Sequence, residues 1–198
     1  FARYDSGKKV LRALGGDIVK RRSVRIFFRT IQRVWQIRKG KAEDPYHRFD
    51  YLMDISEKYG LKSRFFFIAG KIGEKGARYD ISHPAVQQMM AHIVERGHYT
   101  GIHGNFGTAD NATQLKTELQ RMPEVVLPVK AGRQHYLCTY LPETWRIYEE
   151  AGLSYDFSMA YDNDAGFRCG TSNSYPAFNV LHRKLLSLHV QPTIVIET

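Results

Sequence analysis

The chain has 198 residues and an apolar content of 43%, which is enough to build the core of one domain with an appendage. No run of 18 apolar residues occurs, which excludes a helix that crosses a membrane. The only cysteines are Cys138 and Cys169, which argues against a disulfide framework and leads us to expect a cytoplasmic protein in a reducing compartment.

The net charge of +9 is concentrated at the N-terminus. Residues 1–42 contain 13 Lys or Arg and two acidic residues, whereas the remainder of the chain contains 16 Lys or Arg and 18 acidic residues. The body of the protein is therefore nearly neutral, and its overall basicity does not by itself indicate nucleic-acid binding. The sequence carries no helix-turn-helix, zinc-finger or RNA-binding signature, so we expect no nucleic-acid partner.

The basic segment, residues 1–43, is predicted to carry one amphipathic helix over residues 18–38. Six large apolar residues fall on one face at helical spacing, and five arginines lie largely off that face. The apolar residues are Val24, Phe27, Phe28, Ile31, Val34 and Trp35, and the arginines are Arg21, Arg22, Arg25, Arg29 and Arg33. We expect the apolar face to pack on the domain or on a partner, and we prefer this interpretation to binding at a membrane surface.

From residue 44 to residue 198 the sequence alternates between amphipathic helices and short apolar runs. The predicted helices cover residues 44–60 and 84–96 and two segments around Leu115 and Trp145. The predicted strands are RFFFIAG at 64–70, HYTGIHG at 98–104, VVLPV at 125–129, LSYDFSMAY at 153–161, LLSLHV at 185–190 and TIVIE at 193–197. This alternation predicts an α/β domain with a parallel sheet, either a barrel or doubly wound, whose functional site lies where strands run out into loops.

Three consecutive strand patterns carry polar residues near their ends. His98 and His103 are five positions apart and face opposite sides of a strand, so they cannot chelate one ion together. We interpret His98 as structural and His103 as a candidate ligand, the alternative for His103 being a hydrogen-bonded loop histidine. Arg133 and His135 are two positions apart and project to the same side, which suits an anionic or metal-bound centre. Asp156 follows on the next strand, so the sequence predicts a polar site at one mouth of the sheet.

The region from Asp44 to Thr198 resembles a divergent bacterial branch of the polysaccharide deacetylase (carbohydrate esterase) family. The segments that carry the resemblance are DPYHRFDYLMDISEKYGLKSRFFFIAG, GHYTGIHG, GRQHYL, LPETWRIYEEAGLSYDFSMAY and GFRCGT. The resemblance implies a distorted (β/α) barrel at 44–198, with the N-terminal basic helix appended. It also implies metal-dependent removal of acetyl groups from N-acetylated bacterial polysaccharide, with zinc as the divalent cofactor and a glycan as the partner.

The resemblance further assigns roles to individual residues. His103 matches the first of two metal-binding histidines, whereas the second has no counterpart in residues 104–108. His135 stands where the family usually has proline and is taken as a substitute ligand. Arg133 matches the arginine that orients the catalytic base. Asp156 is the one carboxylate that we place near the rim, and it is assigned to catalysis with Arg133.

Aromatic and basic residues near the predicted mouth are assigned to the sugar. Tyr136, Phe167 and Arg168 are the candidate substrate-binding residues, and Phe106 is a further aromatic residue suited to stacking on a sugar ring. The family's Asp pair, which supplies the base and a ligand, would lie immediately before Phe1, so we expect little turnover from this chain alone. The rival hypothesis is a non-catalytic carbohydrate-binding relative that keeps the groove without the chemistry.

Overall fold

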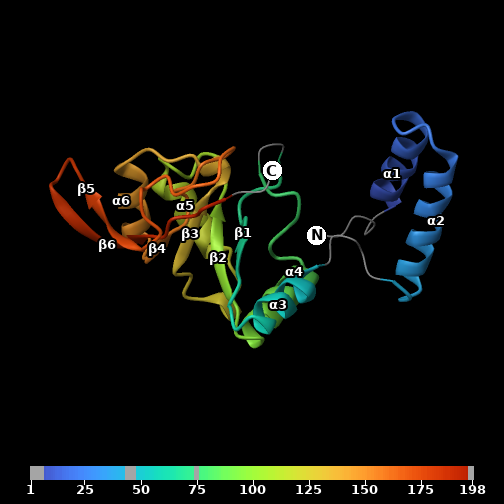
Figure 1. The fold of residues 1–198 in the computed structure, drawn as a ribbon, viewed down its shortest axis with the longest axis horizontal. Coiled ribbons are helices and arrows are strands. Elements are labelled where there is room, and N and C mark those ends of the chain that lie inside the picture. Colours follow the sequence, from blue (N-terminus) through green and yellow to red (C-terminus); the bar gives the residue numbers. More distant parts are fainter. Residues whose placement is uncertain (1–6, 43–47, 74–75, 196–198) are drawn as a thin grey trace. The chain divides into compact units, whose positions relative to one another are not determined.

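The computed structural model describes residues 7–42, 48–73 and 76–195, and the chain divides into two compact units after Tyr59. The first unit contains the helices α1 (Gly7–Val19), α2 (Val24–Arg38) and α3 (Phe49–Lys58). The second unit contains a sheet with three helices and two 3-10 turns (Figure 1). The boundary expected from the sequence, between residues 43 and 44, falls on residues 43–47, which lie outside the described ones.

The elements of the second unit follow one another in a regular order. Its strands are β1 (Arg64–Phe67), β2 (Tyr99–Gly104), β3 (Ala131–Gln134), β4 (Tyr155–Asp156), β5 (Tyr175–Asn179) and β6 (Lys184–Val190). Its helices are α4 (Pro84–Glu95), α5 (Ala112–Gln120) and α6 (Glu143–Glu150), and its 3-10 turns are η1 (Glu124–Val126) and η2 (His135–Leu137).

The N-terminal segment forms a helical hairpin rather than the single helix predicted over residues 18–38 (Figure 1). The chain reverses at the four residues between α1 and α2, where Arg22 has a φ of 48°. Ser23 caps α2, because its Oγ accepts a hydrogen bond from the backbone N of Ile26 at 3.3 Å. Among the described residues, no helix is both long and apolar enough to span a bilayer.

The contact between α1 and α2, which we call the seam of the hairpin, is polar at its centre. Asp17 is buried, and its carboxylate accepts hydrogen bonds from Thr30 Oγ1 at 2.5 Å and from Arg21 Nη1 at 2.6 Å. Thr30 and Val34 are the buried residues of α2, whereas Phe28 lies on the exposed surface. The apolar face that the sequence predicts is therefore only partly the face that α2 buries against α1.

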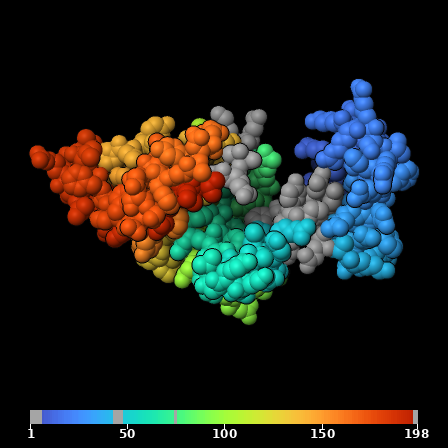
Figure 2. Space-filling view, viewed as in Figure 1, coloured from blue at the N-terminus to red at the C-terminus, as the bar shows by residue number. Residues whose placement is uncertain are grey.

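The second unit is built on one six-stranded sheet in the order β1-β2-β3-β4-β6-β5. Strands β1, β2, β3, β4 and β6 run parallel to one another, and β5 pairs antiparallel with β6 at one edge. The predicted α/β domain with a largely parallel sheet is confirmed, and the sheet curls into a half-barrel. The β5–β6 hairpin projects from the rest of this unit (red in Figures 1 and 2).

Ring contacts across the concave face show how strongly the sheet curls. The rings of Phe66 on β1 and Phe157, just after β4, lie 5.2 Å apart between centroids, although β2 and β3 separate their strands. In a flat sheet those strands would be roughly 14 Å apart, since neighbouring strands are about 4.8 Å apart. Gly101 on β2 makes the room, because a Cβ there would lie 2.6 Å from Phe66 Cε1.

The opposite face of the sheet packs against helices. A Cβ at Gly132 of β3 would lie 2.7 Å from the Tyr148 ring of α6, so β3 and α6 approach closely. The predicted helix over residues 84–96 is confirmed as α4, and four of the five apolar residues expected on its inner face are buried. The four are Val86, Met89, Met90 and Ile93, whereas Val94 is exposed.

Among the described residues, two predicted strands do not form strands, a third, LSYDFSMAY, shortens to the two residues of β4, and one strand was not predicted. VVLPV forms η1 and an extended connection, and β3 begins only at Ala131, because Pro128 has no N–H to donate to a ladder. TIVIE is not a strand over residues 193–195, and its last two residues lie outside the described ones. Strand β5 was missed, since its sequence YPAFN follows a Gly/Ser/Asn-rich stretch that is typical of a loop.

Candidate functional site

Parallel pairing of β2, β3 and β4 sets where the predicted site residues point. His103 lies beside Arg133 in the register of β2 and β3, and Gly132 lies beside Asp156 in that of β3 and β4. Adjacent positions along a strand face opposite sides, and Gly101 already faces the concave side. His103 and Arg133 therefore face the concave side, whereas Asp156 faces the side that α6 covers.

Two histidines from neighbouring strand ends meet directly. His103 Nε2 lies 3.0 Å from His135 Nδ1, and the two rings are nearly perpendicular, with centroids 5.1 Å apart. His135 is the first residue of η2 and follows β3 immediately. By contrast, His98 is buried at the start of β2, where its Nδ1 accepts a hydrogen bond from the backbone N of Ser63 at 3.0 Å.

Electrostatics keep the histidine pair neutral. Burial, together with the smaller effect of the nearby positive charges of protonated His135 and Arg133, lowers the pKa of His103 to about 4. Burial also lowers the pKa of His135. At neutral pH one ring therefore donates an N–H to the lone pair of the other, and both rings keep the neutral form that metal ligation requires.

The low pKa of His103 predicts a pH-dependent stability. An unfolded histidine titrates near pH 6.5 and His103 near 4, so the unfolded state binds the extra proton first as the pH falls. The contribution of His103 to the free energy of unfolding should be fully present well above pH 6.5. Through the titration of His103 alone, the free energy of unfolding should fall by about 2 kcal/mol between pH 7.5 and pH 5. Urea unfolding of the metal-free protein and of His103→Gln at both pH values measures it. An equal pH-induced loss of stability in the two proteins would contradict the assignment.

Asp156 is placed where it cannot reach a substrate. The residue is fully buried, its Oδ2 accepts from Trp145 Nε1 at 2.9 Å, and its Oδ1 accepts from Ser158 N at 2.9 Å and Ser158 Oγ at 2.5 Å. Burial raises its pKa, and these hydrogen bonds together with the charge of Arg133 act in the opposite direction. Asp156 therefore lies beneath the surface that carries Arg133, with both of its carboxylate oxygens hydrogen-bonded to Trp145 and Ser158.

Tyr136 lies next to the histidine pair in an unusual backbone conformation. Tyr136 and Leu137 have φ values of 55° and 54°, a left-handed conformation that costs about 1–2 kcal/mol for a residue with a Cβ. The conformation leaves Tyr136 exposed, with its ring 4.1 Å from that of His135 and 6.4 Å from that of Phe106. Strain of this kind is typical of binding and catalytic sites.

The other two predicted substrate-binding residues lie in the loop between β4 and β5. The backbone N of Gly170 donates to Phe167 O at 2.9 Å, and the backbone N of Gly166 donates to Ile194 O at 2.8 Å, which fixes this turn. Phe167 is half-buried and Arg168 is exposed. The ring and hydrogen-bond contacts of the histidine pair do not include either of them.

The two histidines expected to ligate a metal are the ones that the structure brings together. Their ring nitrogens are 3.0 Å apart and hydrogen-bonded to each other, whereas two nitrogen ligands of a tetrahedral zinc ion, with Zn–N bonds of about 2.05 Å, are roughly 3.3 Å apart and both point at the ion, so the rings would have to turn to hold one. Within the part of the chain that the structure describes, no cluster of three or more His, Cys, Asp or Glu could hold a metal. His103 and His135 would therefore hold such an ion only together with water or with ligands from elsewhere.

A pocket beside this site contains a buried carboxylate that the sequence-based reasoning missed. The pocket encloses about 840 Å³ and borders the loop that follows β2. Glu118 of α5 is 3% exposed and accepts hydrogen bonds from Asn105 N at 3.0 Å and Gln114 Nε2 at 3.1 Å, and burial raises its pKa. The sequence feature that could have predicted this burial is the position of Glu118 between Leu115 and Leu119, on the apolar face of a helix.

Comparison with known proteins adds nothing to this geometry. No protein-family model matches the chain, and neither a curated protein nor a solved structure is significantly similar to it.

Proposed function

We propose that this chain is part of a metal-dependent, deacetylase-like hydrolase that acts on N-acetylated bacterial polysaccharide. The observation that carries the proposal is the facing pair of neutral imidazoles, His103 and His135, at the end of two parallel strands and beside Arg133. The curled sheet is compatible with the distorted (β/α) barrel of the deacetylase type that the sequence resemblance implies.

In this proposal His103 and His135 hold a divalent ion, zinc. When bound, the ion supplies Lewis-acid polarisation of the amide carbonyl and a more acidic water molecule. Arg133 orients the carboxylate that accepts the proton, since its guanidinium stays charged and cannot itself serve as a base. Asp156 positions Arg133 from below through the attraction between their charges.

The sugar would lie against the exposed aromatic pair beside the histidines. Phe106 and Tyr136 meet edge to face, and apolar ring faces of this kind stack on sugars. Phe167 and Arg168 would contact a more distant part of the glycan chain. The two cysteines are free thiols, which supports a reducing compartment, the cytoplasm.

The second candidate function is a carbohydrate-binding relative without catalysis. The observation that favours it is the burial of Asp156 with both carboxylate oxygens already hydrogen-bonded, which leaves this residue unable to serve as a base. The aromatic pair would then bind a glycan, and the histidines would form a neutral hydrogen-bonded pair with no ion.

The decisive experiment is acetate release from N-acetylated glycan fragments at saturating zinc. The 198-residue chain is compared with a chain that carries the implied Asp pair ahead of Phe1. We expect release only from the latter, and we expect His103→Ala to slow that release by about 100-fold or more, because a ligand of the ion is lost. The matched control is His182→Ala, an exposed histidine between β5 and β6, which should leave the rate unchanged.

Two other results separate the hypotheses. Full activity of the 198-residue chain would show that the base lies within it and that Asp156 or Glu118 has been misassigned. Glycan binding without acetate release by either chain would favour the binding-only relative, and the loss of that binding in Tyr136→Ala would locate the sugar at the aromatic pair.

A further inference from the structure

The α1–α2 hairpin carries a set of large apolar side chains that its own packing leaves exposed. Phe28 and Trp35 are 63% and 53% exposed. The set is Leu11, Ile18 and Val19 on α1, and Val24, Phe28, Ile31 and Trp35 on α2. The seam of the hairpin is closed by other residues, around Asp17, Thr30 and Val34, so the exposed set is not needed to hold the two helices together.

Six of these seven exposed residues share one face of the hairpin. With about 100° of rotation per residue, the four on α2 lie within roughly 60° of arc, and Leu11 and Ile18 on α1 lie within roughly 20°. Val19, the last residue of α1, lies about a quarter turn away from them. We call the row that these six residues form on each helix its stripe. Viewed along each helix from its N-terminus, the stripe is rotated by about 110° from the buried residues that face the other helix, and the direction of rotation is the same in both helices. The two helices run antiparallel (Figure 1). Equal rotations about antiparallel axes therefore bring both stripes to the same side. We call this side the apolar face.

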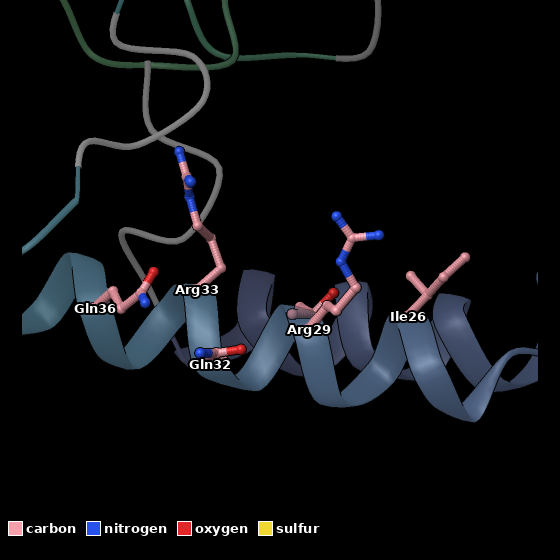
Figure 3. A pocket seen from close by; sticks show the side chains of 6 residues that line it. Ile26, Arg29, Gln32, Arg33 and Gln36 are labelled. Atoms are coloured by element: carbon pink, nitrogen blue, oxygen red, sulfur yellow. The ribbon is translucent and has the colours of Figure 1, made fainter.

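Basic residues border the apolar face on both outer sides. Lys8 and Arg12 on α1 lie about a quarter turn beyond its stripe, and Arg25 and Arg29 on α2 lie about a quarter turn beyond theirs. Arg33 lies about 170° from the centre of the α2 stripe and is not part of this border. The side chains of Arg29 and Arg33 project from the same side of the helix beside a hollow of about 460 Å³ (Figure 3).

The charge of the hairpin is almost entirely positive. Residues 7–42 contain 12 Lys or Arg and a single acidic residue, Asp17, which is buried and hydrogen-bonded in the seam. Lys41 also places its Nζ 5.6 Å from the Trp35 ring, so positive charge adjoins the apolar face directly. An apolar face bordered by cationic rows complements one surface in particular, the headgroup region of an anionic bilayer.

We propose that the α1–α2 hairpin binds the surface of an anionic lipid membrane. The apolar face enters the boundary between headgroups and acyl chains, and the basic rows contact lipid phosphates. Helices of 13 and 15 residues are only about 20 Å long, so the hairpin lies in the plane of the interface. Nucleic acid would use the charge but would leave six large apolar residues in water, which favours the lipid.

The test is sedimentation of the whole chain with phosphatidylcholine vesicles and with vesicles that contain roughly one third phosphatidylserine. We expect binding only to the anionic vesicles, with loss of binding between about 0.1 M and about 1 M NaCl as the Debye length falls. The paired change Arg25→Glu and Arg29→Glu should lower the partition coefficient by about tenfold or more. The matched control is the paired change Lys116→Glu and Lys184→Glu, which reverses two exposed charges in the second unit and should leave vesicle binding unchanged.

The apolar half of the proposal has its own measurement. The chain has two tryptophans, and Trp145 is buried, so a vesicle-induced blue shift in emission that disappears in Trp35→Phe reports insertion of Trp35 itself. The paired change Phe28→Ser and Trp35→Ser should reduce binding about tenfold with an unchanged far-UV circular dichroism spectrum.

Four outcomes would overturn the proposal. One is equal binding to neutral and anionic vesicles, and a second is unchanged binding after the arginine reversal. A third is tighter binding to duplex DNA than to anionic vesicles, abolished by the same reversal. The last is a Trp35 emission that is already blue-shifted without vesicles, which would mean that protein covers the apolar face.

Discussion

Replacing Asp156 with alanine should lower the free energy of unfolding by about 3–5 kcal/mol, the largest stability effect that we expect of any single change near the site. The substitution leaves three donors without their acceptor in a region that excludes water, namely Trp145 Nε1, Ser158 N and Ser158 Oγ. It also removes the negative charge that offsets Arg133. Urea unfolding at pH 7 measures the change.

Two variants control the Asp156 experiment. Asp162→Ala removes an exposed carboxylate from the loop after β4 and should leave the unfolding midpoint unchanged. Asp156→Asn keeps the size of the side chain but turns an NH₂ group toward a donor, and it should lose stability to an intermediate degree. A loss below about 1 kcal/mol for the alanine variant would show that water reaches these donors.

Removing the imidazole of His103 should weaken zinc binding by about 100-fold or more, since one of only two protein ligands is lost. Wild type and His103→Ala are titrated with zinc at pH 7, and His182→Ala serves as the control with an exposed histidine. Affinity should hold down to about pH 6 and fall only below it, because burial keeps His103 neutral well below the ordinary histidine pKa of about 6.5. Equal affinity of the wild type and His103→Ala would place the ion elsewhere.

Local patterns predicted the elements on which the site rests. The apolar run RFFFIAG and the periodicity of residues 84–96 correspond to β1 and α4, and HYTGIHG corresponds to β2. Because parallel strands align their carboxyl ends, strand order alone was enough to expect His103 and His135 close together. Their 3.0 Å separation follows from the register of β2 and β3, which the sequence of either strand does not encode.

Two features depended on long-range packing and could not be predicted. The side that Asp156 faces is set by its position one residue before Phe157, which must fill the concave face opposite Phe66. The sequence pattern LSYDFSMAY has no clear alternation that distinguishes these two sides. Similarly, the periodicity of α2 located the helix but not its seam, because Thr30 and Asp17 close the hairpin through a hydrogen bond rather than through apolar contact.

The strand order β4-β6-β5 also determines when the protein can finish folding as it leaves the ribosome. The α1–α2 hairpin joins residues close in sequence, so it can form as soon as residue 38 has emerged. The sheet, in contrast, receives β6 beside β4 only after residues 184–190 are made, and until then the two-residue strand β4 that carries Asp156 has a free edge. While residues 39–190 are being made, a positively charged hairpin therefore precedes an open sheet, and that sheet needs protection from pairing with other chains.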